Sequence, residues 1–401
     1  FSRTGLLAPG ITTELGGEFV DSNHTEILAL AKTFGLDLWD MAHPDEALFK
    51  REAYLFGGQL RSEEEILQAF RQVAPRLERD IRGGARRWDR ISIAQYLDQT
   101  GVSGWLRGVI DVALRTEYGL DIGEQSAMNF LSLISPDTHD GRIKWFGESD
   151  ERYKIQGGNQ RVPDALAQEV KDQIQLEHRL EAISRTAAGA FQLSFRKNGA
   201  ATEEVTADFV LLTLPFTMLR QVALRVDLPP AKRRAVAELG YGTDAKLMLG
   251  VKRRLWRDQG YGGNLFSDEP FQLAWDSSRR QPGAEGAITS LGGGRGGLEY
   301  GQGSTDDQIQ RLLPGLERAW RGLAAELNGK SARFHWPSHP HTLAAYSCYR
   351  PGQWRSIRGH EFRPVGRLHF AGEHTSLEAQ GYMEGGAETG KRAAQAILKG
   401  L

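Results

Sequence analysis

GRLHFAGEHTS at residues 366–376 and GYMEGGAETGKRAA at residues 381–394 are the two stretches that decide the fold of this chain. The first predicts a buried strand followed by a polar, glycine-containing turn, and the second predicts a helix that begins just after Gly381. Backbone N–H groups at the N-terminus of such a helix can hold the polar edge of a cofactor. Together the two stretches predict a strand, a turn and a helix that bind a cofactor.

These stretches closely resemble the C-terminal flavin-binding signature of the monoamine oxidase and L-amino acid oxidase family, the flavin amine oxidases. The resemblance spans residues 12–398 and is weakest between residues 40 and 150. It implies FAD as the cofactor. It also implies an α/β fold of mixed α+β character, with a glutathione-reductase-like FAD-binding domain and a substrate domain that combines a mixed sheet with helices.

The predicted elements change along the chain from a helix-rich stretch to a β-rich middle and then to an α/β return. Ser62 and Ser304 have the character of helix N-caps, residues 245–251 alternate as a strand, and residues 174–176 are one of several short alternating segments. We expect residues 1–40, 155–225 and 360–401 to form a discontinuous FAD-binding domain. Residues 41–154 and 226–359 would form the substrate-binding domain with a helical insertion.

The composition is typical of a soluble globular protein, since 40% of the 401 residues are hydrophobic, 25% are charged and the net charge is -1. This balance indicates no nucleic-acid partner, and no apolar run approaches the length of a membrane span. No signal or transit peptide is visible, and a single cysteine says little about the compartment. The sequence therefore does not indicate a compartment, and it leaves open whether the chain forms a homo-oligomer.

The family begins with a strand, a G-x-G-x-x-G turn and a helix that hold the FAD pyrophosphate, and residues 1–401 do not start with this unit. The one match to the turn is Gly292–Gly297. A strand-like stretch precedes it but no helix is predicted directly after it, so we expect a surface loop. We therefore expect the chain to be incomplete, or a separate N-terminal chain to carry the phosphate-binding unit. A non-catalytic chain that needs such a partner to bind FAD is one functional hypothesis.

The resemblance also implies which residues bind the cofactor: Gly16, Gly17, Leu180, Gly372, Glu373, Gly381, Tyr382 and Met383. The glycine pair is expected beside the flavin ring, Leu180 against the adenine, and the backbone N–H of Met383 at the flavin pyrimidine. Glu373 would lie near the ribityl phosphate. A carboxyl group there needs either protonation or good hydrogen-bond donors.

Lys246 is the expected catalytic lysine. It stands ten positions before Trp256, and the active-site lysine of the family has the same distance to its tryptophan. The resemblance implies that this lysine holds a water molecule near flavin N5, where it assists hydride transfer, imine hydrolysis or electron flow to oxygen. By the strand pattern alone, a lysine between apolar neighbours is more often an edge or snorkelling residue, and the resemblance reverses this in favour of the functional role.

Tyr382 matches the family tyrosine that stands perpendicular to the flavin face, where two aromatic side chains form a cage for the amine. The segment YSCYRPGQW at residues 346–354 offers Tyr349 and Trp354 as the second wall, and Tyr349 is preferred because it follows Cys348. These three aromatic residues are also the expected substrate contacts. The segment is several residues shorter than in the family, which argues against a covalent link from Cys348 to FAD and favours a buried free thiol.

Two further features bear on metal binding and on the substrate. His335, His339 and His341 lie close together, but prolines interrupt them and no carboxylate or cysteine joins them, so we expect a surface loop and no metal. Glu18 occupies the position where L-amino acid oxidases carry an arginine for the substrate carboxylate, which favours a simple amine. Arg350 is the alternative source of such an arginine.

We therefore predict an FAD-dependent oxidase that deaminates an amine. Hydride moves to flavin N5, water hydrolyses the imine, and O2 is reduced to hydrogen peroxide. An L-amino acid oxidase of the same fold is the first alternative. A desaturase or porphyrinogen oxidase of the same fold is the second, although such enzymes keep the Gly381–Gly385 motif less closely.

Overall fold

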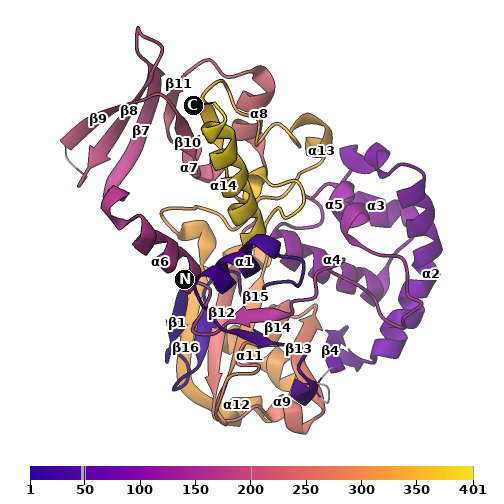
Figure 1. The fold of residues 1–401 in the computed structure, drawn as a ribbon. Coiled ribbons are helices and arrows are strands. Elements are labelled where there is room, and N and C mark those ends of the chain that lie inside the picture. The colour runs from indigo at the N-terminus through magenta and orange to yellow at the C-terminus, as the bar shows by residue number, and fades with distance from the viewer. Residues whose placement is uncertain (47–48, 50, 200, 401) are drawn as a thin grey trace.

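The computed structural model describes residues 1–46, 49, 51–199 and 201–400. The chain forms three regions (Figure 1): a large mixed sheet, a smaller sheet at the other end of the molecule, and a group of helices to one side. Strands from distant parts of the sequence share the large sheet, whereas the second sheet comes entirely from residues 178–225. The division into an FAD-binding and a substrate-binding domain at the boundaries given above stays a prediction.

The large sheet has seven strands, and β12 lies inside it as the second strand from one edge. In spatial order the strands are β16 (Leu327–His335), β12 (Ala245–Val251), β15 (Gly286–Gly292), β14 (Leu273–Asp276), β13 (Tyr261–Ser267), β4 (Arg51–Phe56) and β5 (Gln59–Arg61). Every residue of β12 is buried, because Met248 on its second face packs against Leu7 and Ile11. The predicted strand at residues 245–251 is therefore confirmed, and the N-terminal segment covers one side of it.

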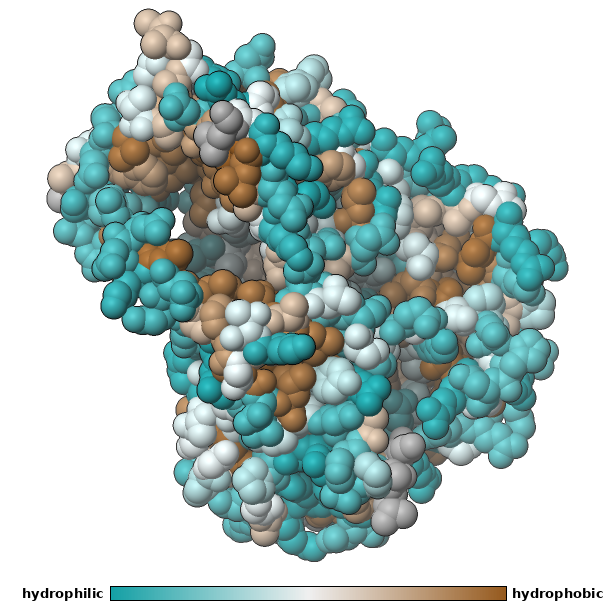
Figure 2. Space-filling view, in the orientation of Figure 1, coloured by the Kyte–Doolittle hydropathy of each residue, from teal (hydrophilic) through white to brown (hydrophobic). Residues whose placement is uncertain are grey.

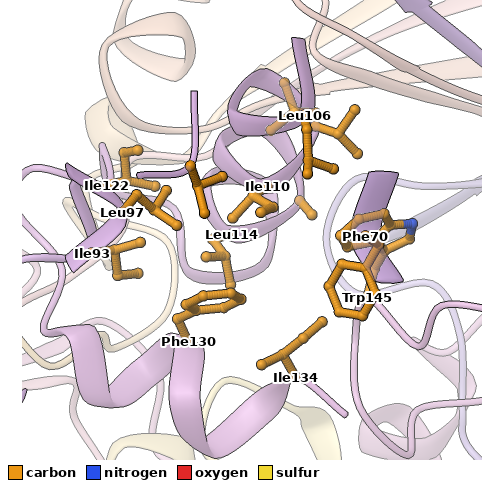
Figure 3. Close-up of a cluster of buried hydrophobic side chains, with 14 of the residues drawn as sticks. Phe70, Ile93, Leu97, Leu106, Ile110, Leu114, Ile122, Phe130, Ile134 and Trp145 are labelled. Atoms are coloured by element: carbon orange, nitrogen blue, oxygen red, sulfur yellow. The ribbon is translucent and has the colours of Figure 1, made fainter. Parts of the chain in front are cut away.

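The helical region has its own apolar core. Its helices are α2 (Glu63–Arg82), α3 (Ile93–Thr100), α4 (Gly104–Tyr118) and α5 (Ala127–Leu133). Ser62 caps α2 in a capping box with Glu65, as the sequence predicts. Figure 3 shows Phe70 and Trp145 side by side in this core, where their ring centroids are 5.5 Å apart. Strands β4 and β5 also come from this part of the sequence, which we expected to be mainly helical.

The second sheet has the order β11-β7-β8-β9. These strands are β11 (Ala223–Arg225), β7 (His178–Arg185), β8 (Phe191–Lys197) and β9 (Ala201–Ala207). The alternating segment predicted at residues 174–176 is wrong, because strand β7 begins only at His178 and Leu176 is 77% exposed. Figure 2 shows the surface hollowed between this sheet and the rest of the molecule, with hydrophobic residues along the hollow.

The strand, turn and helix predicted from the two opening stretches are present. They are β17 (Leu368–Phe370), a 3-10 turn at Glu373–Thr375 and α14 (Met383–Leu398). β17 pairs in parallel with β10 (Val210–Leu212). Helix α14 packs on α1 (Thr25–Thr33), and both carboxylate oxygens of Glu384 accept backbone N–H groups at the start of α1, from Glu26 and Ile27 at 2.9 Å each. This glutamate of the opening motif therefore joins the two ends of the chain.

The expectation of a surface loop at Gly292–Gly297 is wrong. Helix α10 (Gly294–Tyr300) begins directly after β15, and its glycines are buried. A Cβ at Gly296 would lie 2.1 Å from Nε2 of Gln272, and one at Gly297 would lie 2.0 Å from the backbone oxygen of Thr243. Protein atoms therefore fill the space that a phosphate would need, and the glycines serve close packing.

The remaining elements complete the layers. They are β1 (Ser2–Thr4), β2 (Thr12–Glu14), β3 (Leu38–Asp40), β6 (Tyr153–Ile155), α6 (Arg161–Glu169), α7 (Phe216–Leu219), α8 (Pro230–Glu238), α9 (Leu255–Asp258), α11 (Thr305–Ala319), α12 (Leu323–Glu326) and α13 (Gln353–Ser356). Short 3-10 helices lie at Pro44–Glu46, Ala85–Arg90, Lys171–Gln173 and Trp336–Ser338. None of the helices described is both long enough and apolar enough to cross a bilayer.

Candidate active site

A cavity of about 1130 Å³ lies where the N-terminal segment, β12, the end of α4 and the start of α14 meet. Its walls bring together residues that are far apart in the sequence, among them Gly16, Lys246, Tyr346, Tyr382 and Met383. A volume of this size exceeds that of an ordinary pocket for a small ligand. It can therefore hold the ring end of a large cofactor as well as a substrate.

Lys246 lies on β12 and its side chain is buried. Its Nζ donates to the backbone oxygens of Gly16 at 2.7 Å and Glu14 at 3.2 Å. The ammonium lies 3.6 Å from Oε2 of Glu18 and 4.9 Å from the ring centroid of Trp275. Burial lowers the pKa of Lys246, and the Glu18 carboxylate opposes this shift.

Gly16 and Gly17 line the cavity next to Met383. A Cβ at Gly16 would lie 3.0 Å from the Trp336 ring, and one at Gly17 would lie 3.4 Å from Cγ of Met383. Gly381 has φ +88°, a conformation that favours glycine. Because these three glycines have no side chains, their backbone can lie close to the space in front of the N-terminus of α14.

Tyr382 is the residue before α14 and lines the cavity. Its hydroxyl donates a 2.8 Å hydrogen bond to Oε1 of Glu117 at the end of α4, and its ring packs edge-on against His24 at 5.3 Å. Burial raises the pKa of Glu117 to about 7. Tyr382 is therefore held from two sides within the cavity wall.

Tyr349 and Trp354, the residues expected to form the second aromatic wall, do not line the cavity. Tyr349 is 2% exposed, its hydroxyl donates to Glu361, and its ring packs in the core beside Trp354. Tyr346 lines the cavity instead, with its hydroxyl bonded to the backbone oxygen of Thr116 at 2.8 Å. The structure thus places Tyr349 and Trp354 away from the cavity lining, because the loop turns the later aromatic side chains into the core.

Glu373 follows Gly372 at the end of β17 and lines the cavity. Its carboxylate accepts three hydrogen bonds: from Ser347 N at 3.1 Å, Ser347 Oγ at 2.8 Å and Gly381 N at 2.9 Å. Burial raises its pKa. The well-donated environment that a carboxyl needs at this position is therefore present, and it ties the Ser347 segment to the start of the Gly381 turn.

The cavity lining is strongly acidic. Eleven carboxyl side chains face five cationic ones, and burial raises the pKa of Glu52, Glu117, Glu151, Asp244 and Glu373, so the excess of negative charge is smaller than this count and grows as the pH rises. The acidic residues are Glu18, Asp21, Glu52, Glu63, Glu117, Asp140, Glu148, Asp150, Glu151, Asp244 and Glu373, and the basic residues are Arg51, Arg142, Lys144, Lys246 and Arg279. A concave site lined by one sign of charge attracts ligands of the opposite sign. The site therefore suits a cationic ligand.

Several other expected site residues lie elsewhere. Leu180 is half-buried on β7 and packs against the core of the second sheet. The thiol of Cys348 is buried and accepts a hydrogen bond from Asn129 at 3.3 Å, and burial raises its pKa. Arg350 pairs with Glu124 at 2.9 Å on the surface, so it is not placed to bind a substrate carboxylate in the cavity. Neither Cys348 nor Arg350 lines the cavity.

The histidine-rich segment ends β16 and continues past it. His335 bonds to Ser338 at 2.9 Å, and His339 packs among the rings of Phe334 and Trp336. Over the part of the chain that the structure describes, no group of three or more His, Cys, Asp or Glu side chains is arranged to hold a metal ion.

Sequence comparison identifies the family of this site. Residues 2–398 match the model for flavin containing amine oxidoreductases. The chain belongs to this family. A flavin-containing amine oxidase of Danio rerio is 22% identical over 407 residues, which cover 96% of this chain and 76% of the relative. A putative L-amino-acid oxidase of Bacillus subtilis is 26% identical over 350 residues, covering 84% and 70%.

Solved structures show the same fold as this flavin amine oxidoreductase. Cyclohexylamine oxidase from Brevibacterium oxydans superposes with a TM-score of 0.83 at 20% identity, and putrescine oxidase bound to putrescine with 0.80 at 18%. Both comparisons cover 100% of this chain and 90% of the other chain. The protein is an FAD-dependent amine oxidase, and the predicted family, fold class and cofactor are confirmed.

The cavity fits the ring end of FAD. Helix α14 runs for 16 residues, and its first turn leaves backbone N–H groups at Met383 without an intrahelical acceptor. Gly16 and Gly17 leave the facing wall free of side chains, and Lys246 reaches the same cavity. These residues match the position that the sequence resemblance implies for the flavin.

Proposed function

We propose that this enzyme oxidises the C–N bond of a small amine, with Lys246, Tyr382 and Tyr346 around the reacting carbon. Bound FAD would take the hydride at N5 and pass the electrons to O2 as hydrogen peroxide, and the imine product would hydrolyse to a carbonyl compound and ammonia. The observation that carries this proposal is the position of the Lys246 ammonium in the same cavity as Tyr382 and the N-terminus of α14.

Lys246 is proposed to hold a water molecule or a substrate group in the cavity. An ammonium has three N–H donors. Two of them bond to the Glu14 and Gly16 carbonyls, and the Glu18 carboxylate at 3.6 Å lies beyond ordinary hydrogen-bond distance. One N–H of the Lys246 ammonium is therefore left to bond to a group in the cavity. The same nitrogen can hold or release a proton.

Tyr382 and Tyr346 are proposed as the two aromatic walls that orient the amine, and Tyr346 takes the role first expected of Tyr349 or Trp354. Both tyrosine hydroxyls are engaged with α4, one at Glu117 and the other at Thr116. Their rings are thereby fixed, because each is anchored through its hydroxyl to the same helix. A fixed cage excludes water and orients a neutral amine for hydride loss.

The cavity favours an amine over an amino acid. The excess of carboxylates attracts a protonated amine and repels a substrate carboxylate. Arg279 lines the cavity, but its guanidinium already bonds to Glu46 at 3.3 Å and to the Met41 carbonyl at 3.1 Å. Glu18 stands where the sequence resemblance implies an arginine in L-amino acid oxidases, and its negative charge supports the same choice.

A matched pair of substrates tests this choice. 2-Phenylethylamine and L-phenylalanine differ by one carboxylate, so anaerobic mixing of each with the FAD-loaded enzyme isolates that group. We expect the amine to bleach the flavin absorbance and the amino acid to do so much more slowly. Faster bleaching by the amino acid would establish the L-amino acid oxidase alternative, and no bleaching by a broad set of amines would contradict the proposal.

The predicted partners beyond the substrate and O2 are a separate N-terminal chain carrying G-x-G-x-x-G and a second copy of this chain. Mass spectrometry of the natively purified protein tests both. A second small polypeptide that co-purifies with FAD would support the first, and a mass twice that of the chain would support the second.

A further inference from the structure

Glu18 lies at the junction between the N-terminal segment and the large sheet, and its carboxylate contacts three residues from that part of the molecule. Its side chain is 2% exposed. Oε1 accepts a hydrogen bond from Lys154 Nζ at 2.7 Å, and Oε2 accepts one from the Trp275 indole at 3.0 Å. The Lys246 ammonium is 3.6 Å from Oε2. One buried carboxylate is thus shared between two buried lysines.

The direct bond to Lys154 fixes where this charge sits. Lys154 comes from β6 and also donates to the Ser277 carbonyl at 2.6 Å. Trp275 comes from β14, and its ring lies 4.9 Å from Lys246 Nζ. The carboxylate is therefore held on one side by strong donors, close to Lys246 but not bonded to it.

This arrangement of charges influences whether Lys246 is protonated. Burial disfavours an ammonium, and the charged groups around Lys246 are Glu18, Glu14 and Lys154. Glu18 is the strongest of the groups that favour the charged form, and Lys154 opposes it. Glu14 contributes less because its own pKa is raised by burial, although Ser2 and Asn159 donate to it.

We infer that Glu18 is a positioning residue for Lys246: anchored by Lys154 and Trp275, it keeps the ammonium charged against the Glu14 and Gly16 carbonyls and leaves one N–H for the cavity. The inference rests on the proposed role of Lys246. It adds that the Glu18 carboxylate acts through Lys246. Lys154 binds the other side of this carboxylate and so limits its effect on Lys246.

Two substitutions with opposite expected signs test this inference. Glu18→Gln removes the negative charge, so the pKa of Lys246 should fall. Lys154→Met leaves the whole Glu18 carboxylate to Lys246, so the pKa should rise. Lysine labelled with ¹³C at Cε, titrated by NMR in the FAD-loaded protein, reports the pKa directly, and Lys246→Met identifies the signal.

The rate of flavin reduction should also respond to substitution of Glu18. We expect Glu18→Gln to slow anaerobic flavin reduction by about tenfold to a hundredfold through misplacement of the ammonium, and to move the pH profile in the direction of the NMR shift. Glu18→Asp keeps the charge and should restore part of the rate. Asp80→Asn is the control, because Asp80 is a buried carboxylate bonded to Arg76 and Arg87 near the end of α2 and does not line the cavity.

The outcomes separate the two proposals. If Glu18→Gln and Lys154→Met leave the Lys246 signal and the pH profile unchanged, Glu18 is only structural and the inference is overturned. If Glu18→Gln does not fold, Glu18→Asp withdraws the carboxylate from Lys246 and should lower the Lys246 pKa to a smaller extent; an unchanged pKa in this variant overturns the inference. If Lys246→Met both reduces and reoxidises the flavin at the normal rates, the proposed role of Lys246 fails, whatever the effect of Glu18 on its pKa.

Discussion

The Tyr382 hydroxyl and the Glu117 carboxylate form a 2.8 Å hydrogen bond that connects the residue before α14 to the last turn of α4. One partner comes from the C-terminal flavin motif and the other from the helical region. The bond therefore fixes an aromatic wall of the cavity by an acceptor that the motif does not contain. Since burial raises the pKa of Glu117 to about 7, the protonation of this acceptor changes near neutral pH.

We predict that Glu117→Gln flattens the dependence of stability on pH. The unfolded chain releases the Glu117 proton near pH 4.5, and the folded chain keeps it to about pH 7, so folding stability falls as the pH rises through this window. Glutamine cannot ionise but still offers an oxygen to Tyr382. The difference between the two proteins should reach at most about 3 kcal/mol above pH 7. Thermal midpoints measured from pH 4 to 8 report this difference in stability, and the exposed Glu378→Gln is the control. Parallel curves for Glu117→Gln and the unchanged protein would show that Glu117 does not titrate in this pH range.

The hydrogen bond between Glu117 and Tyr382 also shows what sequence reasoning missed. Val109 and Ala113 are buried on α4, and Glu117 follows at the same spacing of four residues, which places a carboxylate in line with an apolar stripe. That pattern was available in the sequence as a signal. Lys246, Met383 and Tyr382 could be predicted because each lies in a short local motif whose neighbours decide its position.

The second aromatic wall could not be predicted in this way. Tyr346 and Tyr349 lie three residues apart in a segment without helix or strand, so no periodicity says which ring faces the core. Contacts distant in sequence decide it: Glu361 takes the hydroxyl of Tyr349, and α4 takes that of Tyr346. Helix α10 (Gly294–Tyr300) was missed for a related reason, since glycine has a low helix propensity and close packing against β12 and Gln272 favours a helix there.

Lys246→Met should slow anaerobic flavin reduction by the amine, or reoxidation by O2, by about 10²–10⁴-fold, the usual contribution of a group that handles protons. Methionine keeps the length of the side chain and fills the buried site. Stopped-flow absorbance of the flavin separates the two half-reactions. Lys252→Met is the matched control, because Lys252 directly follows β12 and is exposed; equal rates in the two variants would contradict a functional role for Lys246.

Tyr346 and Tyr349 should respond differently to substitution. We expect Tyr346→Ala to raise KM and slow flavin reduction, because it removes a wall of the cavity. Tyr349→Phe should leave these parameters nearly unchanged but lower stability by about 1–3 kcal/mol, because it removes a donor from the buried Glu361 carboxyl. Steady-state kinetics and thermal unfolding of both variants check this, and the opposite pattern would restore Tyr349 as the substrate contact.

The acidic cavity predicts a dependence on ionic strength. If the carboxylates attract a protonated amine, kcat/KM for that amine should fall as salt screens the charges, with the steepest change below about 0.15 M, where the Debye length is about 8 Å. An uncharged alcohol with the same carbon skeleton as the amine, tested as an inhibitor, provides the control, and its inhibition constant should change little. A kcat/KM that does not depend on salt would show that the lining does not steer the substrate.

Glu384 supplies the last prediction, because this glutamate of the GYMEG motif faces α1. Its carboxylate accepts the N–H groups of Glu26 and Ile27, and it is 6% exposed. Glu384→Ala leaves two buried donors without acceptors at a helix N-terminus, which should cost about 1–2 kcal/mol and lower the thermal midpoint. Glu384→Gln keeps one acceptor, so its stability should lie between those of Glu384→Ala and the unchanged protein, while Glu378→Ala, exposed on the loop before α14, should have no effect. Because α1 follows the segment that carries Gly16 to Glu18, we also expect Glu384→Ala to weaken FAD binding in a fluorescence titration. A loss of stability without weaker FAD binding would mean that the 16–18 segment is held in place by its other contacts, which include Lys246, Lys154, Trp275 and Asn159.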